Sequence, residues 1–325
     1  VLGIFDKELD IPRYVYWGLF ALQHRGQESG GIALTDGTNI HTYRGMGLIS
    51  TVFENGVPDN EGGHIGIGHV RYSTTGSNNP RNIQPLAVYT SMGEIALAHN
   101  GNLTNTRELR DMLENAGQTF QTTMDSEIIV NLISRSRKPT VEERIIDSVK
   151  EIDGAYSLVL MTKEKMYGAR DPHGFRPLCI GRTATGGYVL ASETCALDAL
   201  GAAFVRDVKP GEFIEIGENG LKSVLFTNAA RKQVCSFEYI YFAVPTAALT
   251  VRTFIRRVST WAEKCGMKRV MKRTLLFPSL TAARRRLSGM LWRRVSRSTT
   301  VLLKTAIWGV PLLSRIKSSV NWPYA

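Results

Sequence analysis

The stretch Ile65-Gly66-Ile67-Gly68-His69-Val70-Arg71-Tyr72-Ser73-Thr74-Thr75-Gly76 decides how this chain is interpreted. It begins as an apolar strand and ends in polar residues and glycine, as strands do where they build sites. The run Glu94-Ile95-Ala96-Leu97-Ala98-His99 repeats this pattern and continues into Asn100-Gly101-Asn102. Each motif also has a simpler interpretation by itself, because Arg71 suits a solvated strand end and His-Asn-Gly suits a turn.

Two further polar clusters, Leu22–Ser29 and Met124–Glu127, stand where predicted strands or helices begin or end. Asp125 precedes a predicted helix, so the simplest interpretation makes it a helix N-cap. Together the clusters would also suit a zwitterion, with Arg71 binding a carboxylate and Asp125 an ammonium group. An asparagine amide beside a glycine N–H would suit an oxyanion. These residues alone do not choose a substrate.

The pattern of apolar residues predicts many strands and few helices without regular alternation, which favours a layered α+β fold. Asn105 with Glu108 forms a capping box for a helix over 106–116, and Gly117 suits its C-terminal end. Thr140 with Glu143 starts another helix in the same way. The predicted strands are 65–71, 94–99, 155–162 and 188–192, and the predicted helices are 11–23, 106–116, 126–136 and 141–152.

Composition excludes several classes of protein. With 43% hydrophobic and 21% charged residues, the chain has the balance of a globular protein and not of a disordered one. No apolar run approaches the ~18 residues of a membrane helix, and the start shows no signal-peptide pattern. The four cysteines are scattered without a CxxC pair, which excludes a zinc ribbon and a disulfide scaffold. We therefore expect a cytoplasmic protein.

The net charge of +11 is distributed very unevenly along the chain. Residues 244–325 hold 17 Lys and Arg against one acidic residue, whereas residues 1–243 hold 23 basic and 28 acidic residues. An acidic body therefore carries a basic tail. One hypothesis makes this tail a nucleic-acid- or membrane-binding segment on a non-catalytic module.

The four polar clusters, in this order and spacing, resemble the glutaminase domain of the amidophosphoribosyltransferases. Three more stretches share the resemblance, namely Asp171–Leu178, Ala191–Cys195 and Cys235–Phe242. The related glucosamine-6-phosphate synthases are less similar, because they have Arg-Gly-Tyr-Asp in place of Arg25–Glu28 and Trp in place of Tyr72. The resemblance covers residues 1–243 and implies the four-layer αββα sandwich of the N-terminal nucleophile hydrolases.

The resemblance also implies roles for individual residues. Arg71, with Thr74 nearby, would hold the α-carboxylate of glutamine, and Asp125 would pair with its α-ammonium group. Asn100 and the Gly101 N–H would bind the oxyanion. Arg25 and Gly26 would line the pocket beside the nucleophile, a cysteine expected two residues before Val1. Because that cysteine is not in the sequence, we expect the chain as printed to lack glutaminase activity.

The implied reaction is acyl transfer from glutamine to a cysteine thiolate, with release of ammonia. In the intact family enzyme, which is homo-oligomeric, ammonia then displaces pyrophosphate from phosphoribosylpyrophosphate held with Mg²⁺, the first step of de novo purine synthesis. Some members also carry a [4Fe-4S] cluster, and Cys235 aligns with one of its ligands. We expect no cofactor in this chain and no specific nucleic-acid or membrane partner.

The sequence departs from the family directly after Ala243. The family continues Arg-Pro-Asp-Ser, whereas this chain has Val244-Pro245-Thr246-Ala247. Codons for Ala243 to Ala247, read one base out of register, can spell Arg-Pro-Asp-Ser. Phe277–Leu291 and Leu303–Leu313 can likewise spell strings that resemble the transferase domain. We therefore predict a glutaminase domain over 1–230, the start of a transferase domain over 231–243, and an out-of-frame tail without a native fold over 244–325.

Overall fold

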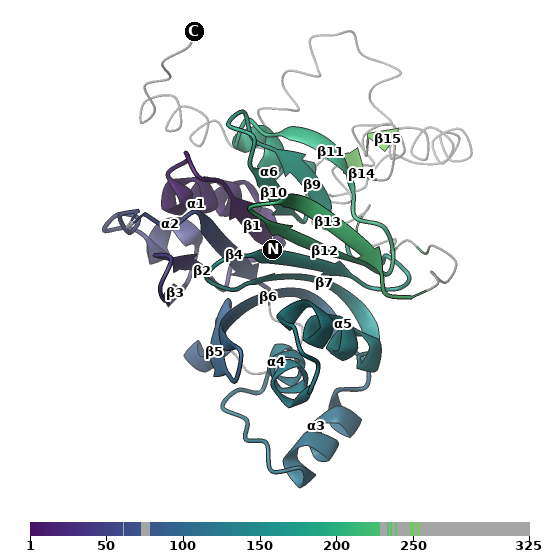
Figure 1. Cartoon of the computed structure of the whole chain (residues 1–325). Helices are drawn as coiled ribbons and strands as arrows, with labels where there is room; N and C mark the ends of the chain where they lie inside the picture. The colour runs from purple at the N-terminus through teal and green to yellow at the C-terminus, as the bar shows by residue number, and fades with distance from the viewer. Residues whose placement is uncertain are drawn as a thin grey trace, which may run out of the picture.

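The computed structural model describes residues 1–60, 62–72 and 79–227, the single residues Gln233, Cys235 and Glu238, and the backbone of 248–249 and 252–253. Two antiparallel sheets pack face to face between two layers of helices (Figure 1). This arrangement is the αββα sandwich that the family resemblance implies, and it agrees with the layered α+β fold predicted from the apolar pattern. Within the described residues, no helix has both the length and the apolar character needed to cross a membrane.

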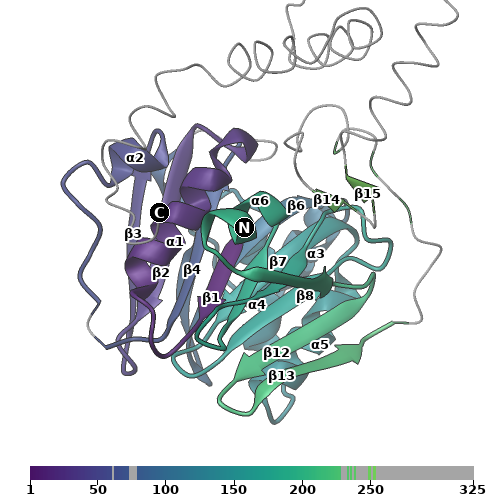
Figure 2. The same cartoon turned by 90° about the horizontal axis from the view of Figure 1, so that it is seen from above.

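The first sheet has the strand order β11-β9-β10-β1-β4-β2-β3. Helices α1, α2 and α6 cover its outer face, and the view from above shows α1 lying across β1, β2 and β4 (Figure 2). Apolar residues such as Val15 and Leu19 of α1 pack there on Leu2 and Ile4. The elements are β1 Leu2–Phe5, α1 Ile11–Ala21, β2 Ser29–Thr35, β3 Ile40–Met46, α2 Ile49–Val52, β4 Ile65–Arg71, β9 Cys179–Arg182, β10 Tyr188–Ala191, α6 Thr194–Ala199 and β11 Ala203–Asp207.

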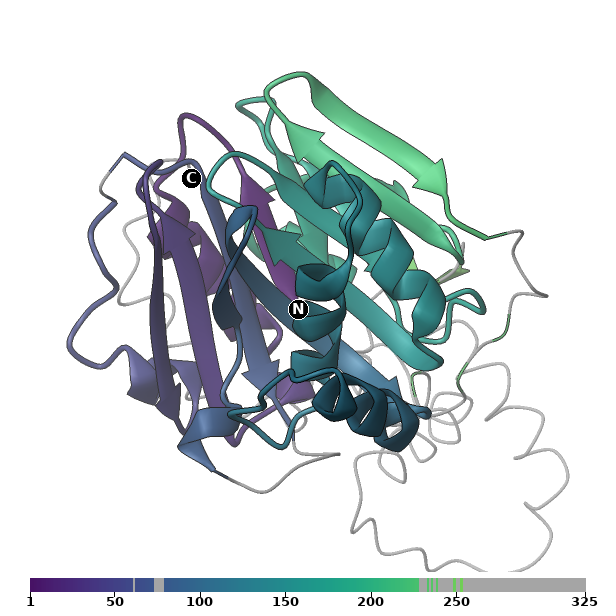
Figure 3. The ribbon, with the colours of Figure 1, turned by 60° about the horizontal axis from the view of Figure 1, so that its bottom comes forward.

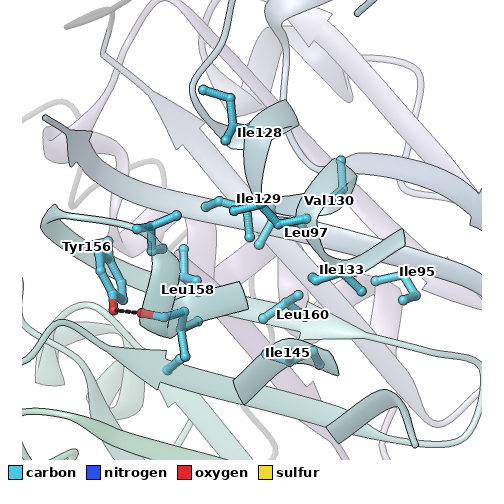
Figure 4. Packing of buried hydrophobic residues seen from close by; sticks show 14 of the residues in the cluster. Ile95, Leu97, Ile128, Ile129, Val130, Ile133, Ile145, Tyr156, Leu158 and Leu160 are labelled. Atoms are coloured by element: carbon cyan, nitrogen blue, oxygen red, sulfur yellow. Dashed lines mark hydrogen bonds between the residues drawn. The ribbon is translucent and has the colours of Figure 1, made fainter. Parts of the chain in front are cut away.

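The second sheet has the order β13-β12-β8-β7-β6-β5 and is covered by α3, α4 and α5 (Figure 3). Ile129 and Ile133 of α4 pack on Leu97, Leu158 and their neighbours (Figure 4). The elements are β5 Leu86–Thr90, β6 Gly93–Leu103, α3 Thr106–Asn115, α4 Ser126–Arg135, α5 Val141–Glu151, β7 Gly154–Met161, β8 Met166–Arg170, β12 Glu212–Gly217 and β13 Gly220–Leu225. Two 3₁₀ turns, η1 Gln23–Arg25 and η2 Pro80–Asn82, and a small pair, β14 Ala248–Leu249 and β15 Arg252–Thr253, complete the described elements.

A third apolar layer lies between the sheets and contains Ile67, Ala98 and Val159. The sheets approach closely at Gly3 of β1. A Cβ atom at this position would lie 2.6 Å from both the Met166 sulfur and Val159 Cγ1. Gly3 therefore lets the first strand run through the centre of the sandwich, which brings the first residue, Val1, to the site described below.

The four predicted helices occur as α1, α3, α4 and α5, whereas the short helices α2 and α6 were not predicted. One cap also works differently from its prediction. At the end of α3, Gly117 has φ +85°, and the Gly117 and Gln118 N–H groups donate to the carbonyls of Glu114 and Leu113. At its start, Asn105 does not cap the helix, so the predicted capping box is wrong. Its side chain instead binds the loop after α5, through the Glu151 carbonyl and the Asp153 N–H.

Strand β6 is longer than the sequence predicts. It continues through His99, Asn100 and Gly101 to Leu103, which pairs with Gly154 of β7. The turn interpretation of His-Asn-Gly is therefore wrong, because ladder pairing with β7 overrides the local turn preference. The predicted boundaries near 230 and 243, and nearly all of the tail, fall outside the described residues.

Candidate active site

A cavity lies at the ends of β4 and β6, where they meet the start of α4. Both sheets contribute to it, so side chains far apart in the sequence share one space. Its lining is unusually polar and includes three arginines, two histidines and one carboxylate. The lining residues are Arg25, His69, Val70, Arg71, Tyr72, Gln84, His99, Asn100, Gly101, Met124, Asp125 and Arg176.

Arg71 is the last residue of β4 and is only 4% exposed. Its carbonyl accepts from the Glu28 N–H at 3.1 Å, which fixes the backbone where the strand ends. Gly26 lies against this backbone, since a Cβ atom on Gly26 would come within 2.4 Å of the Arg71 carbonyl carbon. Gly26 is not among the lining residues, so it does not line the pocket as the resemblance implies and instead packs against the Arg71 backbone.

Asp125 occupies the N-cap position of α4 without capping the helix, so the simplest interpretation of this residue is wrong. Its carboxylate accepts from the Leu103 N–H at 3.1 Å and lies 3.5 Å from His99 Nδ1. Burial raises the pKa of Asp125, but the nearby His99 and these hydrogen bonds outweigh burial and leave the pKa below its usual value. The site therefore keeps a buried negative charge at neutral pH.

Asn100 and Gly101 lie side by side on β6 and both line the cavity. Asn100 Nδ2 donates to Ser192 Oγ at 3.4 Å, and the Val1 amine donates to the same oxygen at 2.9 Å. Val1 and the Asn100 amide are therefore linked through one shared acceptor, Ser192 Oγ. Gly101 is confined by β7, because a Cβ there would lie 2.0 Å from the Ala155 carbonyl oxygen.

Comparison with known proteins gives this arrangement a family. A glutamine amidotransferase domain model matches residues 69–199, which include the end of β4 and all of β6 and α4. The amidophosphoribosyltransferase of Bacillus subtilis is 46% identical over 246 residues, covering 75% of this chain and 51% of the relative. That of Methanocaldococcus jannaschii is 44% identical over 270 residues, covering 77% and 56%. The chain belongs to the amidophosphoribosyltransferase family.

The fold agrees with this assignment. A solved glutamine phosphoribosylpyrophosphate amidotransferase from B. subtilis, in complex with ADP and GMP, superposes with a TM-score of 0.81 at 37% identity. That match covers 90% of this chain and 64% of the solved chain. The chain spans about half the length of the curated family members it matches.

A buried group of charges joins the cavity to Glu238, a residue that follows β13 in the sequence. Arg25 Nε lies 2.5 Å from Glu193 Oε1, and Arg25 Nη2 lies 2.7 Å from Glu238 Oε2. Arg176 Nη1 lies 3.1 Å from the other oxygen of Glu238. The sequence motifs contain all four residues, but of these only Arg25 received a role. Glu193 and Glu238 each stand in a mostly apolar stretch, 191–197 and 237–242. A charged residue in such a stretch is rarely buried without a partner, so this pattern could have identified both glutamates.

Two histidines in the cavity were also missed. His69 Nδ1 and His99 Nε2 are buried and have no hydrogen-bond partner among the described residues. Burial keeps the pKa of His69 well below its usual value. His69 is therefore uncharged at neutral pH.

Two predicted residues need separate treatment. Thr74 lies outside the described residues. Cys235 is described, and its role as an iron–sulfur ligand stays a prediction. Burial raises the pKa values of Cys179 and Cys195, so both remain thiols, and neither lines the cavity.

A possible metal-binding group within the described part of the chain lies elsewhere and comprises His24, Glu193 and Cys195. The ligand atoms of these three residues lie within 4.8 Å of one another. Arg25, however, contacts the same Glu193 oxygen as His24. A guanidinium at this position opposes the binding of a cation, so these residues fit a charge network better than a metal site.

Proposed function

We propose that this chain carries the glutamine-binding and glutaminase part of an amidophosphoribosyltransferase. In the whole protein, glutamine, phosphoribosylpyrophosphate and water would give phosphoribosylamine, glutamate and pyrophosphate, the first step of de novo purine biosynthesis. The observation that carries this proposal is the shared cavity of Arg71, Asp125 and Asn100, with Val1 one hydrogen-bonded step away. Mg²⁺ would act with phosphoribosylpyrophosphate in the part of the protein that binds it.

The cavity suits the two charges of an amino acid. Arg71 offers a buried guanidinium for the α-carboxylate of glutamine, and Asp125 offers a carboxylate for its α-ammonium group. The Leu103 N–H and His99 hold the Asp125 carboxylate at the cavity, so this side chain does not cap α4. Both partners are then fixed before the ligand arrives, which lowers the entropic cost of binding.

The reaction centre would lie between Asn100 and the start of the chain. A cysteine joined through one residue to Val1 would attack the γ-carbonyl carbon as a thiolate, and its own amine would act as the base. The C–S bond forms as the carbonyl oxygen becomes an oxyanion, held by Asn100 Nδ2 and the Gly101 N–H. The C–N bond then breaks, ammonia leaves with the transferred proton, and water hydrolyses the thioester to glutamate.

No described cysteine supplies this nucleophile. Burial raises the pKa values of Cys179 and Cys195, and a thiol with a raised pKa is a poor nucleophile near neutral pH. Neither residue lines the cavity, and Cys235 does not line it either. The chain as printed would therefore bind glutamine without hydrolysing it.

A pair of extended chains tests the proposal. One carries Cys-Gly before Val1 with a free cysteine amine, and its matched control carries Ser-Gly. We expect the cysteine form to release glutamate and ammonia from glutamine, and we expect neither the serine form nor the printed chain to do so. Hydrolysis by the printed chain, or glutamine binding without hydrolysis by the cysteine form, would contradict the proposal.

A further inference from the structure

Glu238 bridges two arginines that line the cavity, although it does not line the cavity itself. One carboxylate oxygen contacts Arg25 and the other contacts Arg176, and the Glu238 side chain is only 4% exposed. Arg25 is held on its other edge by Glu193. A buried carboxylate between two guanidinium groups is a strongly coupled arrangement, because little water screens the charges.

These partners decide the net charge around the cavity. The lining side chains include three guanidinium groups, those of Arg25, Arg71 and Arg176, against the single carboxylate of Asp125. His69 is uncharged near neutral pH, because its pKa is lowered. Glu193 and Glu238 supply the two further negative charges that offset this excess. Without Glu238, the described side chains would leave the cavity with an additional positive charge.

Charge is also what separates the substrate of the proposed reaction from its product. Glutamine is a zwitterion without net charge near neutral pH, whereas glutamate carries one further carboxylate and a net negative charge. The two molecules are otherwise nearly the same size and shape. A cavity with surplus positive charge would hold glutamate more tightly than a balanced one, and would release the product more slowly.

We propose that Glu238 is a specificity-determining residue, which balances Arg25 and Arg176 so that the cavity favours glutamine over glutamate. This inference rests on the proposed glutaminase function. Glu238 acts through the arginines and does not touch the ligand. Its position is fixed locally, because the Glu238 N–H donates to the Cys235 carbonyl and the nearby Gln233 N–H donates to the His173 carbonyl. The segment after β13 thereby sets the charge of a cavity built by the two sheets.

The test measures binding to the full chain as printed, which is not expected to turn glutamine over. Dissociation constants for L-glutamine and L-glutamate are determined by titration calorimetry near neutral pH at one ionic strength. For Glu238→Gln we expect glutamate affinity to rise relative to glutamine affinity by about tenfold, the effect of one buried charge acting over roughly 10 Å. For Arg176→Gln we expect the ratio to shift in the opposite direction.

Two controls separate charge from structural damage. Glu212→Gln breaks the Arg206–Glu212 pair, whose glutamate is 2% exposed and which lies away from the cavity lining. We expect this variant to leave the ratio unchanged. The double variant Glu238→Gln with Arg176→Gln removes one charge of each sign, so we expect its ratio to return to that of the parent chain.

Each outcome has a definite meaning. If Glu238→Gln binds glutamine with an unchanged ratio, or if the double variant keeps the shifted ratio, the inference is overturned. If Glu238→Gln does not fold, Arg176→Gln carries the test, and an unchanged ratio there overturns the inference as well. If the parent chain binds neither ligand, the proposed function itself fails and the inference fails with it.

Discussion

In the proposed function, recognition of an amino acid would depend on Asp125, because it is the only carboxylate among the residues that line the described cavity. The hydrogen bond from the Leu103 N–H and the contact with His99 hold its carboxylate in place without a ligand. A charged partner fixed in this way contributes more than a mobile surface charge. Its removal should therefore weaken the binding only of ligands that carry an ammonium group.

We expect Asp125→Asn to weaken glutamine binding by at least tenfold, roughly the 1.5–3 kcal/mol of a hydrogen bond to a charged group. Glutaramate, which is glutamine without its α-ammonium group, is an anion, so it should bind the variant at least as tightly as it binds the parent chain. The exposed Asp198→Asn serves as the control and should change neither affinity. Equal losses for both ligands would show that Asp125 supports the cavity without contacting the ammonium group.

Gly101 is constrained by space, since a Cβ would also come within 2.8 Å of Tyr156 Cα. Because backbone atoms cannot give way as a flexible side chain can, we expect Gly101→Ala to destabilise the chain by about 3 kcal/mol. Gly217→Ala is the matched strand control, where the nearest atom is Lys165 Cγ at 3.3 Å. Urea unfolding measures both variants, and equal midpoints would refute the steric argument.

At the residue scale, the sequence motifs predicted the candidate ligand-binding residues but not the buried glutamates that offset the positive charge of the arginines. Arg71, Asp125 and Asn100 stand in motifs, and the structure brings them to one cavity. Glu193 and Glu238 pair with a residue 168 and 213 positions away, respectively. No local pattern reports pairing over such separations, because it depends on how the two sheets and the following segment come together.

At the scale of elements, the helices are specified by local signals and the strand ends are not. Thr140 Oγ1 accepts from the Glu143 N–H at 3.2 Å, as the sequence predicts, and α5 begins at the next residue. Periodic apolar residues likewise place α4 within one residue of its predicted end. Strand β6 extends past its predicted end because β7 supplies the partner, and that partner lies about fifty residues further along the chain.

The two caps make a matched pair for mutation. We expect Thr140→Ala to cost about 1 kcal/mol, the usual effect of losing a side-chain N-cap. Asn105→Ala should cost more than this, because it removes two hydrogen bonds to the loop after α5 and leaves that loop's backbone groups unpaired. Thermal or urea unfolding measures both. A smaller loss for Asn105→Ala would indicate that water replaces the two bonds.

The turn between β1 and α1 gives the fold a dependence on pH. Burial raises the pKa of Asp6, but hydrogen bonds from Thr183, Thr185 and the N–H groups of Glu8 and Leu9 outweigh it and lower the pKa. A lowered folded-state pKa means that Asp6 contributes stability above its unfolded value of about 3.9, and that this stability is lost as pH falls through the folded value.

We therefore expect the difference in stability between the parent chain and Asp6→Asn to be constant near neutral pH. The difference should shrink as the pH falls below about 4. Urea midpoints measured across this range give the comparison. The exposed Glu114→Gln is the control, because it should give a small difference without this pH dependence. A difference that stays constant down to the lowest pH would contradict the assigned role of Asp6.

At the scale of the whole molecule, the apolar clusters of the described residues lie within the body. The described members of all three apolar clusters lie at or before Phe226. Glu238, whose carboxylate pairs with the cavity residue Arg25, is the last residue along the chain in a described ion pair with the cavity lining. A tail translated out of frame is under no selection for a consistent apolar period, so it has no reason to share a buried face with this body.

The tail can be tested by removing it. We expect a chain ending at Ala243 to match the full chain in unfolding midpoint and in glutamine affinity, because no described core residue lies beyond that point. A chain ending at residue 232 is the matched control. It loses Glu238 as well, so we expect it to bind glutamate more tightly relative to glutamine.

Salt-sensitive binding of DNA by the tail would not by itself argue for a role, since any segment of charge +16 binds polyanions without specificity. A large loss of stability on cutting at Ala243 would instead mean that the tail packs on the body as evolved protein, and the out-of-frame hypothesis would then be withdrawn.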